Sequence, residues 1–267
     1  IRSFLFHYYS VCRFRLQVEY SGESLAKLRC VHYDSLMKRG NLFMNISYIT
    51  HSCFLVELDS CYLLFDYYRG TLPRMKEDKP LYVFASHAHA DHYSTRIFKL
   101  KHPSITWILS SDIAAAHPHI QVEAGKCYTV NDLQVRTLAS TDEGVAFLVT
   151  AEDNCIYHAG DLNWWDWGDE NTPQEHAEMK ERYFRELQSI KGMHFDVAFL
   201  PVDPRLKERA LKGARAFLQY ASCDLLVPMH FWKDTAVFTW LRHSEIQNIE
   251  AMQLWLGFQE LETFTKV

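Results

Sequence analysis

Residues 85–94 read ASHAHADHYS and directly follow the apolar run LYVFA at 81–85. Three imidazoles and one carboxylate, all potential metal ligands, fall within six positions of this stretch: His87, His89, Asp91 and His92. Side chains two apart in an extended segment point the same way, so His87 and His89 can converge on one point. A bend after them would bring Asp91 and His92 to a neighbouring point. Zinc and iron accept imidazole and carboxylate together, so this pattern predicts a metal site at the end of a strand.

The length and composition indicate a soluble globular protein. A chain of 267 residues accommodates one large domain or two small ones and can bury a substantial core. Its residues are 48% hydrophobic and 23% charged, and no uncharged apolar run reaches the roughly 18 residues needed to span a bilayer. We therefore expect no insertion into a membrane.

Cysteine usage favours a reducing compartment. The seven cysteines are scattered along the chain, with no Cys-x-x-Cys pair that would suggest a structural zinc or a redox site. Reduced thiols and the absence of a cleavable signal pattern together predict a cytoplasmic protein.

A change in charge separates the first 43 residues from the remainder. Residues 1–43 have a net charge of +4, whereas residues 44–267 have a net charge of −9. We expect the functional domain to span 44–267 and to begin at Met44, with 1–43 an extension outside it. A short ordered extension is the alternative, because FLFHYY at 4–9 and FRLQVEY at 14–20 are apolar enough to pack or to form strands.

Two strand-rich halves, each followed by helices, predict two sheets packed face to face with helices outside. Apolar runs bounded by turn residues predict strands over 46–49, 53–58, 61–67, 81–86, 105–109, 127–130, 133–138, 145–150, 155–159, 196–201, 224–230 and 251–255. Capping residues and helical spacing predict helices over 94–101, 111–117, 174–191, 206–221 and 235–243.

Two further candidate ligands stand where predicted strands end. Asp161 follows a strand in IYHAGDLN, and His230 ends the strand LLVPM. Loops at strand ends are where rigid scaffolds hold reactive groups. With residues 85–92, these two positions resemble the ligand signature of the metallo-β-lactamase superfamily, and THSCFLVEL at 50–58 resembles its opening hairpin.

This resemblance implies an α/β fold, the four-layer αββα sandwich, with the site along one edge of the sheets. It covers the chain from about Met44 onward and implies one or two divalent metal ions, zinc foremost, with iron and manganese as alternatives. It assigns His87 and His89 to the first metal and Asp161 to a bridging position. The second metal receives three ligands: Asp91, His92 and His230.

The sequence departs from the superfamily pattern at one ligand of the first metal. The superfamily usually supplies a further histidine from the loop before the bridging aspartate. Here that loop reads LASTDEGVAF at 138–147, and no histidine lies between His119 and His158. Asp142 is the strong charged ligand nearest that position. It could complete the first site, bind a water on the metal, or cap the turn before Gly144, whereas the second site keeps all its expected ligands.

Four more residues have both a functional and a structural interpretation. His51 resembles a position near the site, although a buried histidine bonded to the backbone is the equal alternative. For His158, close to the bridging aspartate, we favour a supporting or structural role. Trp164 and Trp232 lie beside ligands in polar loops, so we expect them to line the substrate pocket rather than the core.

The function that we expect is hydrolysis of a small ester, lactone or phosphoester, with Asp91 as the catalytic carboxylate. The main alternative is a nucleic-acid phosphodiesterase, although phosphate backbones reward lysine and arginine and the body of this chain is acidic. Two further alternatives are redox chemistry at a di-iron site and a degenerate protein that binds metal but has no activity. We expect a small-molecule substrate and no nucleic-acid partner, and the sequence leaves the oligomeric state open.

Overall fold

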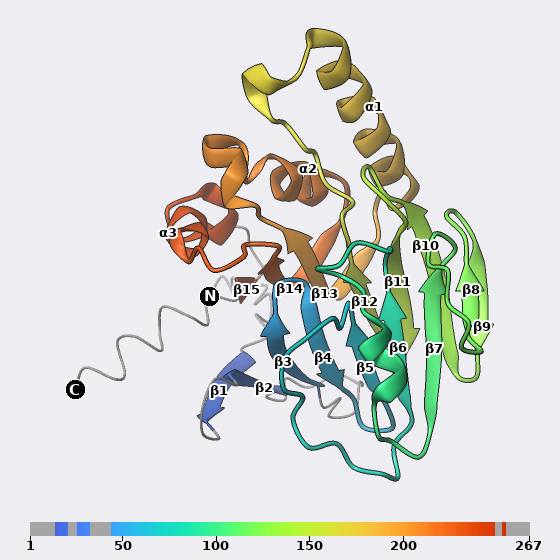
Figure 1. Ribbon diagram of the computed structural model, residues 1–267. Helices are drawn as coiled ribbons and strands as arrows, with labels where there is room; N and C mark the ends of the chain where they lie inside the picture. The colour runs from blue at the N-terminus through green and yellow to red at the C-terminus, as the bar shows by residue number, and fades with distance from the viewer. Residues whose placement is uncertain (1–13, 21–25, 33–43, 249–252, 255–267) are drawn as a thin grey trace, which may run out of the picture.

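Two β-sheets stack face to face (Figure 1). The computed structural model describes residues 14–20, 26–32, 44–248 and 253–254, and side chains over 44–246. In the described residues the first sheet has eight strands, adjacent in chain order: β1 (Phe14–Tyr20), β2 (Ala26–His32), β3 (Met44–Thr50), β4 (Cys53–Glu57), β5 (Tyr62–Phe65), β6 (Leu81–Ala85), β7 (Ile105–Ser110) and β8 (Ile120–Val122). The second has seven, in the order β15 (Gln253–Leu254), β14 (Ser222–Met229), β13 (His194–Pro201), β12 (Asn154–His158), β11 (Val145–Ala151), β10 (Leu133–Ala139) and β9 (Cys127–Val130).

Each sheet changes from antiparallel to parallel pairing part-way across. Strands β1 to β5 are antiparallel, and β5 to β8 are parallel. In the second sheet β9 to β12 are antiparallel, and β12 to β15 are parallel. The carboxyl ends of parallel neighbours lie at one edge of a sheet, and that edge is where α/β proteins usually bind ligands.

Alternate side chains of the first sheet enter two different cores. Phe65 and Phe84 face the second sheet, where Phe84 meets Phe147 at 5.2 Å between ring centroids. Leu64 and Val83 face the opposite way and pack in the outer cluster with Ile97. Strands covered on both faces are apolar throughout rather than alternating, which is why YLLF and LYVFA were recognisable as buried strands.

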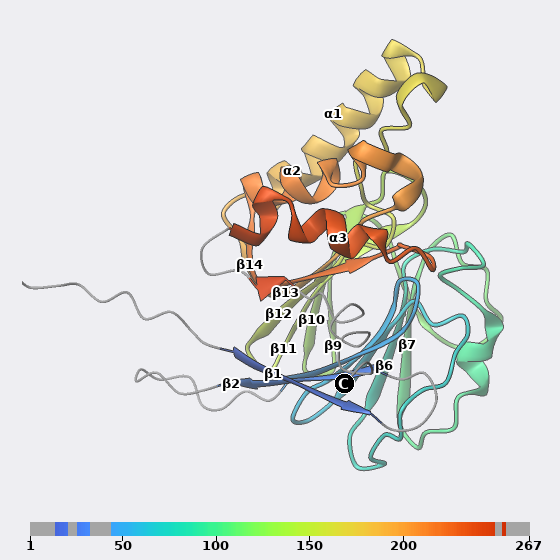
Figure 2. The same ribbon diagram turned by 90° about the vertical axis from the view of Figure 1, so that its left-hand side faces the viewer.

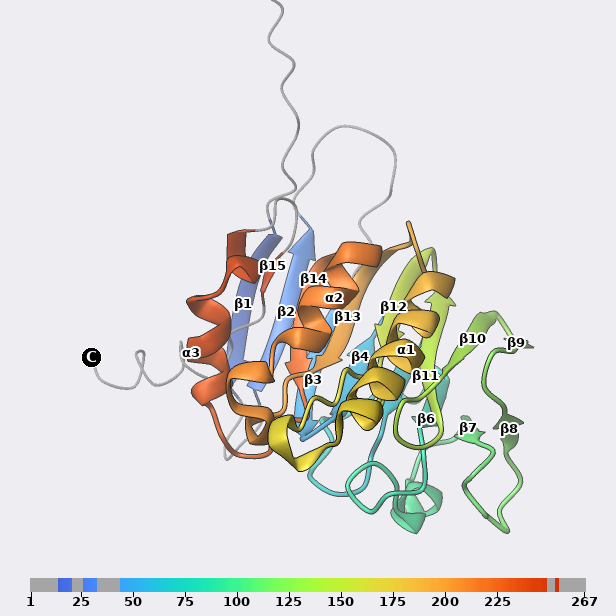
Figure 3. The ribbon, with the colours of Figure 1, turned by 90° about the horizontal axis from the view of Figure 1, so that it is seen from above.

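The helices form outer layers of unequal thickness (Figures 2 and 3). Three α-helices lie over the second sheet: α1 (Pro173–Ser189), α2 (Lys212–Tyr220) and α3 (Ala236–Arg242). The first sheet is covered by the 3₁₀ helix η1 (Thr95–Lys99) and by loops. Three further 3₁₀ turns occur in the described residues: η2 (Gly168–Glu170), η3 (Pro204–Arg209) and η4 (Glu245–Asn248). The predicted αββα architecture is confirmed, and no helix in the described part of the chain could cross a membrane.

The structure departs from the predicted elements on the outer side of the first sheet. The segment 94–101, predicted to be a helix, forms only the short η1, and 111–117 is not helical. Asp112 there accepts a hydrogen bond from the backbone nitrogen of Ala88 at 2.7 Å, and Pro118 disfavours helical backbone at the residue before it. Strand β8, three residues long, gave too short an apolar pattern to be predicted.

The N-terminal strands extend the first sheet. β2 pairs with β3 from Lys27 opposite Ser47 to Cys30 opposite Met44, and β1 pairs with β2. Strand formation over 14–20 agrees with the alternative of an ordered extension. Residues 1–13, including FLFHYY, lie outside the described residues together with 21–25 and 33–43, so the domain boundary at Met44 stays a prediction.

Gly144, just before β11 of the second sheet, lies against Ser86 and His87, just after β6 of the first sheet. Replacing Gly144 tests this close contact between the sheets. It has φ +68°, and a Cβ there would lie 2.0 Å from the Ser86 carbonyl oxygen and 2.6 Å from the His87 Cβ. Gly125 is the matched control, with φ +71° and open space around it. We expect Gly125→Ala to lower the free energy of unfolding by about 1–2 kcal/mol through backbone strain alone. Gly144→Ala should cost about 1–3 kcal/mol more, because backbone must move. Urea unfolding of both variants measures the difference, and equal losses would contradict this close contact.

Candidate metal centre

The predicted ligands come from strand ends at one edge of the sandwich. His87 lies just beyond β6, Asp161 three residues beyond β12, and His230 directly after β14. β5 and β6 are parallel neighbours, as are β12, β13 and β14, so these ends lie side by side within each sheet. Stacking the two sheets brings both sets of ends together.

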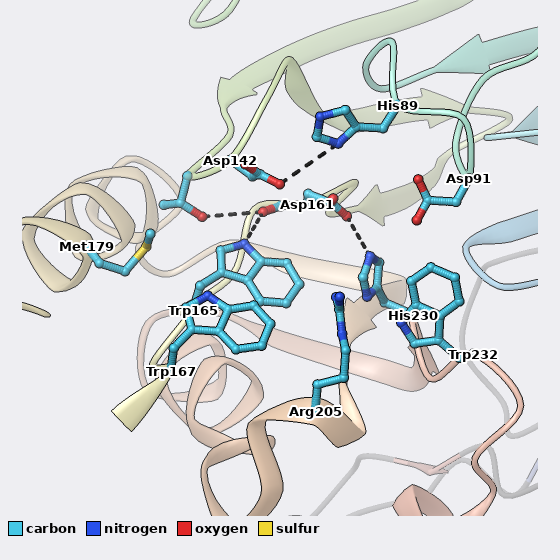
Figure 4. A pocket seen from close by; sticks show the side chains of 11 residues that line it. His89, Asp91, Asp142, Asp161, Trp165, Trp167, Met179, Arg205, His230 and Trp232 are labelled. Carbon is cyan, nitrogen blue, oxygen red and sulfur yellow. Dashed lines mark hydrogen bonds and ion pairs between the residues drawn. The ribbon is translucent and has the colours of Figure 1, made fainter. Parts of the chain in front are cut away.

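The carboxylate of Asp161 is the centre of the cluster. The side chain points toward His230 in Figure 4 and is only 4% exposed. Three imidazole Nε2 atoms surround it: that of His92 lies 3.1 Å and that of His230 3.4 Å from Oδ1, and that of His87 lies 3.4 Å from Oδ2. Asp161 is itself held through its backbone oxygen, which accepts a 2.9 Å hydrogen bond from the Trp165 indole nitrogen.

Several buried polar atoms in this cluster have no hydrogen-bond partner in the described part of the chain. They are both ring nitrogens of His51, Nε2 of His87, Nε2 of His92 and Oδ1 of Asp161. Native proteins pair nearly all their buried polar atoms, because an unpaired one costs about 1–3 kcal/mol. Lone pairs of nitrogen and oxygen that face one another are instead the donor set of a divalent metal ion. The residues present therefore fit a metal centre.

The candidate donors form two groups. One consists of His51, Asp91, His92 and His230, and the other of His87, His89 and Asp161; within each group the donor atoms all lie within 4.8 Å of one another. The first group is buried except for the half-buried Asp91, whereas His89 in the second group is exposed. Asp161 also contacts two members of the first group, as a bridging carboxylate would.

Comparisons with known proteins concern the fold that carries these donors. The family model of the β-lactamase superfamily domain matches residues 45–166. A metal-dependent hydrolase of Desulforamulus reducens is 23% identical over 215 residues, which cover 70% of this chain and 84% of that protein. The crystal structure of a predicted metal-dependent hydrolase from Parabacteroides distasonis superimposes with a TM-score of 0.53 at 15% identity, over 84% of this chain and 97% of that one. Together these findings support the metallo-β-lactamase superfamily, and the chain has its fold.

Buried acids orient the imidazoles of this metallo-β-lactamase fold. Asp66 Oδ2 lies 2.7 Å from His92 Nδ1, and Asp203 Oδ2 lies 2.9 Å from His230 Nδ1. Each contact fixes the ring so that its Nε2 faces Asp161, which is the usual arrangement around protein-bound metals. His87 is held in the same way by the Ser86 hydroxyl, 2.9 Å from its Nδ1.

Asp66 organises the most buried part of the site, and sequence reasoning missed it. Its carboxylate accepts hydrogen bonds from both the backbone nitrogen and the hydroxyl of Ser86, at 2.7 and 2.8 Å, besides contacting His92. The available signal was an acid directly after the apolar strand YLLF, the same signal that identified other ligands. Asp203, which orients His230, lies two residues beyond β13.

His51 joins the donors, whereas His158 stays behind them. The His51 ring lies 4.2 Å from that of His230 between centroids, and its Nε2 is 3.3 Å from Asp91 Oδ2. Its ring nitrogens have no backbone partner, which disfavours the structural alternative. His158 Nε2 instead lies 2.9 Å from the Ser52 carbonyl oxygen, and its ring stacks on Phe65.

Asp142 faces the cavity without joining either donor group. Its Oδ2 lies 4.0 Å from His89 Nδ1, and its side chain is half exposed (Figure 4). The turn before Gly144 is capped by Ser140, whose hydroxyl accepts the Asp142 backbone N–H at 3.1 Å. Of the three roles considered for the carboxylate, the structure thus disfavours capping and leaves metal or water binding open.

The backbone is strained around the site. Eight described residues other than glycine have positive φ, and four of them lie here: His51 (51°), Asp66 (47°), His230 (60°) and Trp232 (54°). Such conformations cost about 1–3 kcal/mol each and cluster at functional sites, where surrounding structure holds them in place. The clustering supports a functional role for this edge.

Burial and charge set the protonation of the cluster. Burial lowers the pKa of His51 and of His87 to about 4, so both rings are neutral at pH 7 and keep a lone pair. Burial opposes ionisation of Asp161, but His92 and His230 hold its pKa well below the usual range. Burial also disfavours a charged His92, yet Asp161 and Asp66 on either side raise its pKa well above 6.5.

A cavity of about 420 Å³ opens beside the donors. Figure 4 shows its walls of Trp165, Trp167 and Trp232, with Met179 at one side. Trp232 lies where the sequence predicted. Trp164 does not line this cavity and is a correction: its ring packs 5.2 Å from that of Phe184 on α1. Neighbouring residues of an extended loop face opposite ways. The wall is therefore formed by Trp165 and Trp167.

The bridging position of Asp161 predicts unequal effects of two substitutions. Asp161→Ala should remove more metal than Asp142→Ala, because Asp161 contacts donors of both groups and Asp142 approaches only His89. Metal content per chain after dialysis, measured by elemental analysis, gives the comparison. Equal losses would make Asp142 a full ligand, and no loss from either would contradict the site.

The buried Asp66 predicts an effect on metal affinity from a residue that does not bind the metal. Asp66→Asn keeps the side-chain volume but replaces one carboxylate oxygen with an amide NH₂ group. That group would face the donors of Ser86 and His92, so the His92 ring would lose the partner that fixes its orientation. We expect metal affinity to fall about 10- to 100-fold, the usual effect of losing such a partner. Asp59→Asn, an exposed acid elsewhere, is the control and should leave affinity unchanged. Competition with a chromophoric chelator measures both, and an unaltered affinity in Asp66→Asn would remove its orienting role.

Proposed function

We propose that the protein is a metal-dependent hydrolase that uses a metal-activated water on a small ester, lactone or phosphoester. The observation that carries this proposal is the set of unpaired buried donors beside an open cavity. When bound, zinc lowers the pKa of its water from about 15.7 to about 7 and polarises the scissile group. The superfamily match and the hydrolase relatives support the same reaction type.

Asp91 is the residue that we assign to proton transfer. It lines the cavity, and its Oδ2 lies 3.3 Å from His51 Nε2. Burial opposes its ionisation, but His51 and His92 hold its pKa well below the usual range. The ionised carboxylate can accept a hydrogen bond from the attacking water and orient it. Because its lowered pKa keeps it ionised but makes it a weak base, orientation of the water is the larger part of the role that we assign to it.

The cavity and the charge of the chain support a small substrate. A volume of about 420 Å³ falls at the lower end of the range for small-molecule pockets. Indole walls suit an apolar or planar substituent next to the reacting group. A net charge of −5 for the whole chain disfavours a nucleic-acid backbone as the substrate.

We further propose that the more buried donor group, which contains the three ligands assigned above to the second metal, is occupied before the other group. It offers three imidazoles and Asp91 with the bridging Asp161, whereas the second group has the exposed His89 and lacks a close fourth ligand. Zinc suits this mixture of nitrogen and oxygen donors, and iron and manganese are the alternatives.

The five described cysteines are all free, which supports a reducing cytoplasm as the site of action.

A substrate panel with metal control tests the hydrolase. We expect the metal-loaded protein to hydrolyse at least one of an aryl ester, a lactone, a thioester and a phosphodiester. Activity should disappear on chelation and return on addition of zinc. Asp91→Asn should lower kcat about 10²- to 10⁴-fold, the usual contribution of a positioned acid or base. Metal content of the variant is the control, and a metal-replete wild type that turns over no substrate would sink the proposal.

A further inference from the structure

The Arg205 side chain lines the cavity and is held in place by the carboxylate of Asp203. Its Nε lies 3.0 Å from both carboxylate oxygens of Asp203, and its Nη2 lies 2.6 Å from Oδ2. Asp203 is fully buried, whereas the Arg205 side chain is half exposed. The carboxylate therefore fixes one edge of the guanidinium, and Asp203 does not engage the remaining nitrogen, Nη1.

Two indoles hold the guanidinium between them. The Arg205 carbon Cζ lies 5.2 Å from the ring centroid of Trp167 and 5.3 Å from that of Trp232. Figure 4 shows the side chain extending between these walls toward the donor cluster. A guanidinium stacked on aromatic rings keeps its in-plane N–H groups available to an oxyanion, with little rotamer entropy left to lose.

The loop that carries Trp167 is itself fastened. Asp166, next to Trp167, forms an ion pair with Lys212 and lies 3.6 Å from Arg209 Nε. The Gly168 backbone nitrogen donates to Asp166 Oδ1 at 3.1 Å. The wall against Arg205 is therefore positioned before any ligand enters, which lowers the entropic cost of binding.

Arg205 is the one permanent cation among the residues that line the cavity within the described chain. The other charged groups in the lining are the carboxylates Asp91, Asp142 and Asp161. Of these, Asp91 and Asp161 are candidate metal ligands, so a bound metal offsets their charge. Arg205 then has Asp203 as its paired counter-charge, and Asp142 is the lining carboxylate that neither candidate donor group includes.

We propose that Arg205 binds an oxyanion of the substrate, a carboxylate or a phosphate separate from the bond that is cleaved. This inference rests on the proposed hydrolase function and narrows its substrate class to anionic esters or lactones. Fork-shaped guanidinium recognition is the geometry that suits carboxylate and phosphate. The role is substrate recognition; the alternative is that Arg205 only steadies Asp203 and, through it, His230.

Binding to the metal-loaded protein tests this assignment without requiring turnover. Trp167 and Trp232 flank Arg205, so tryptophan fluorescence reports occupancy. The probes are succinate, inorganic phosphate and neutral succinamide. We expect Arg205→Gln to weaken the binding of succinate, of phosphate or of both at least tenfold and to leave succinamide unchanged. Whichever anion shows the larger loss identifies the group recognised.

Arg205→Lys is the matched variant, because it keeps the charge but cannot form the planar fork. It should bind the preferred anion more tightly than Arg205→Gln and more weakly than wild type. Metal content is measured in each protein. Equal anion affinity in wild type and Arg205→Gln would overturn the proposal. Equal losses of affinity for the anions and for succinamide would also overturn it. So would a loss of metal without a selective loss of anion binding. A protein that passes this test yet hydrolyses nothing would overturn only the proposed hydrolase.

Discussion

A carboxylate buried among imidazoles is the constraint on which the site depends. Removing Asp161 from water is expensive unless a positive charge compensates it, and three Nε2 atoms lie within 3.4 Å of its oxygens. Asp66 and Asp161 flank the His92 ring and raise its pKa, so a charge on this ring would offset part of that cost. A divalent ion would supply more charge and would also pair the lone pairs that the described residues leave unsatisfied. The same geometry therefore serves folding and metal binding.

The sheets determine where this carboxylate can be. Parallel pairing aligns the ends of β5 and β6 in one sheet and of β12, β13 and β14 in the other. Each of these strands ends in an acid or histidine that either faces the centre or orients a residue that does. Positive φ at four positions there costs several kcal/mol in sum, and only the extensive apolar core behind the edge can offset it. Rigidity at this edge thus follows from burial elsewhere.

Sequence patterns identified residues that the structure brings together as candidate ligands, but not the residues that orient them. His87, Asp161 and His230 each follow a run of apolar residues, so a strand end with a ligand was visible without coordinates. Asp66 follows such a run too, but its role depends on which strand pairs with β5, which local pattern does not reveal. Trp164 was misplaced because the direction of a side chain in a loop alternates along the chain, and the sequence does not show the starting phase. Long-range pairing and local phase therefore limited the prediction.

Unequal burial of the two donor groups connects the metal to the substrate. A metal at the enclosed group would be shielded from solvent, so its interactions with Asp91 and Asp161 would be strengthened by the low local dielectric. The other group opens to the cavity through His89, where Asp142 stands in place of the usual histidine at 4.0 Å. A carboxylate at that distance can reach a metal through water or leave room for a substrate oxygen. The fold thus encloses the donor group that includes His51 and leaves the group that includes His89 open to the cavity.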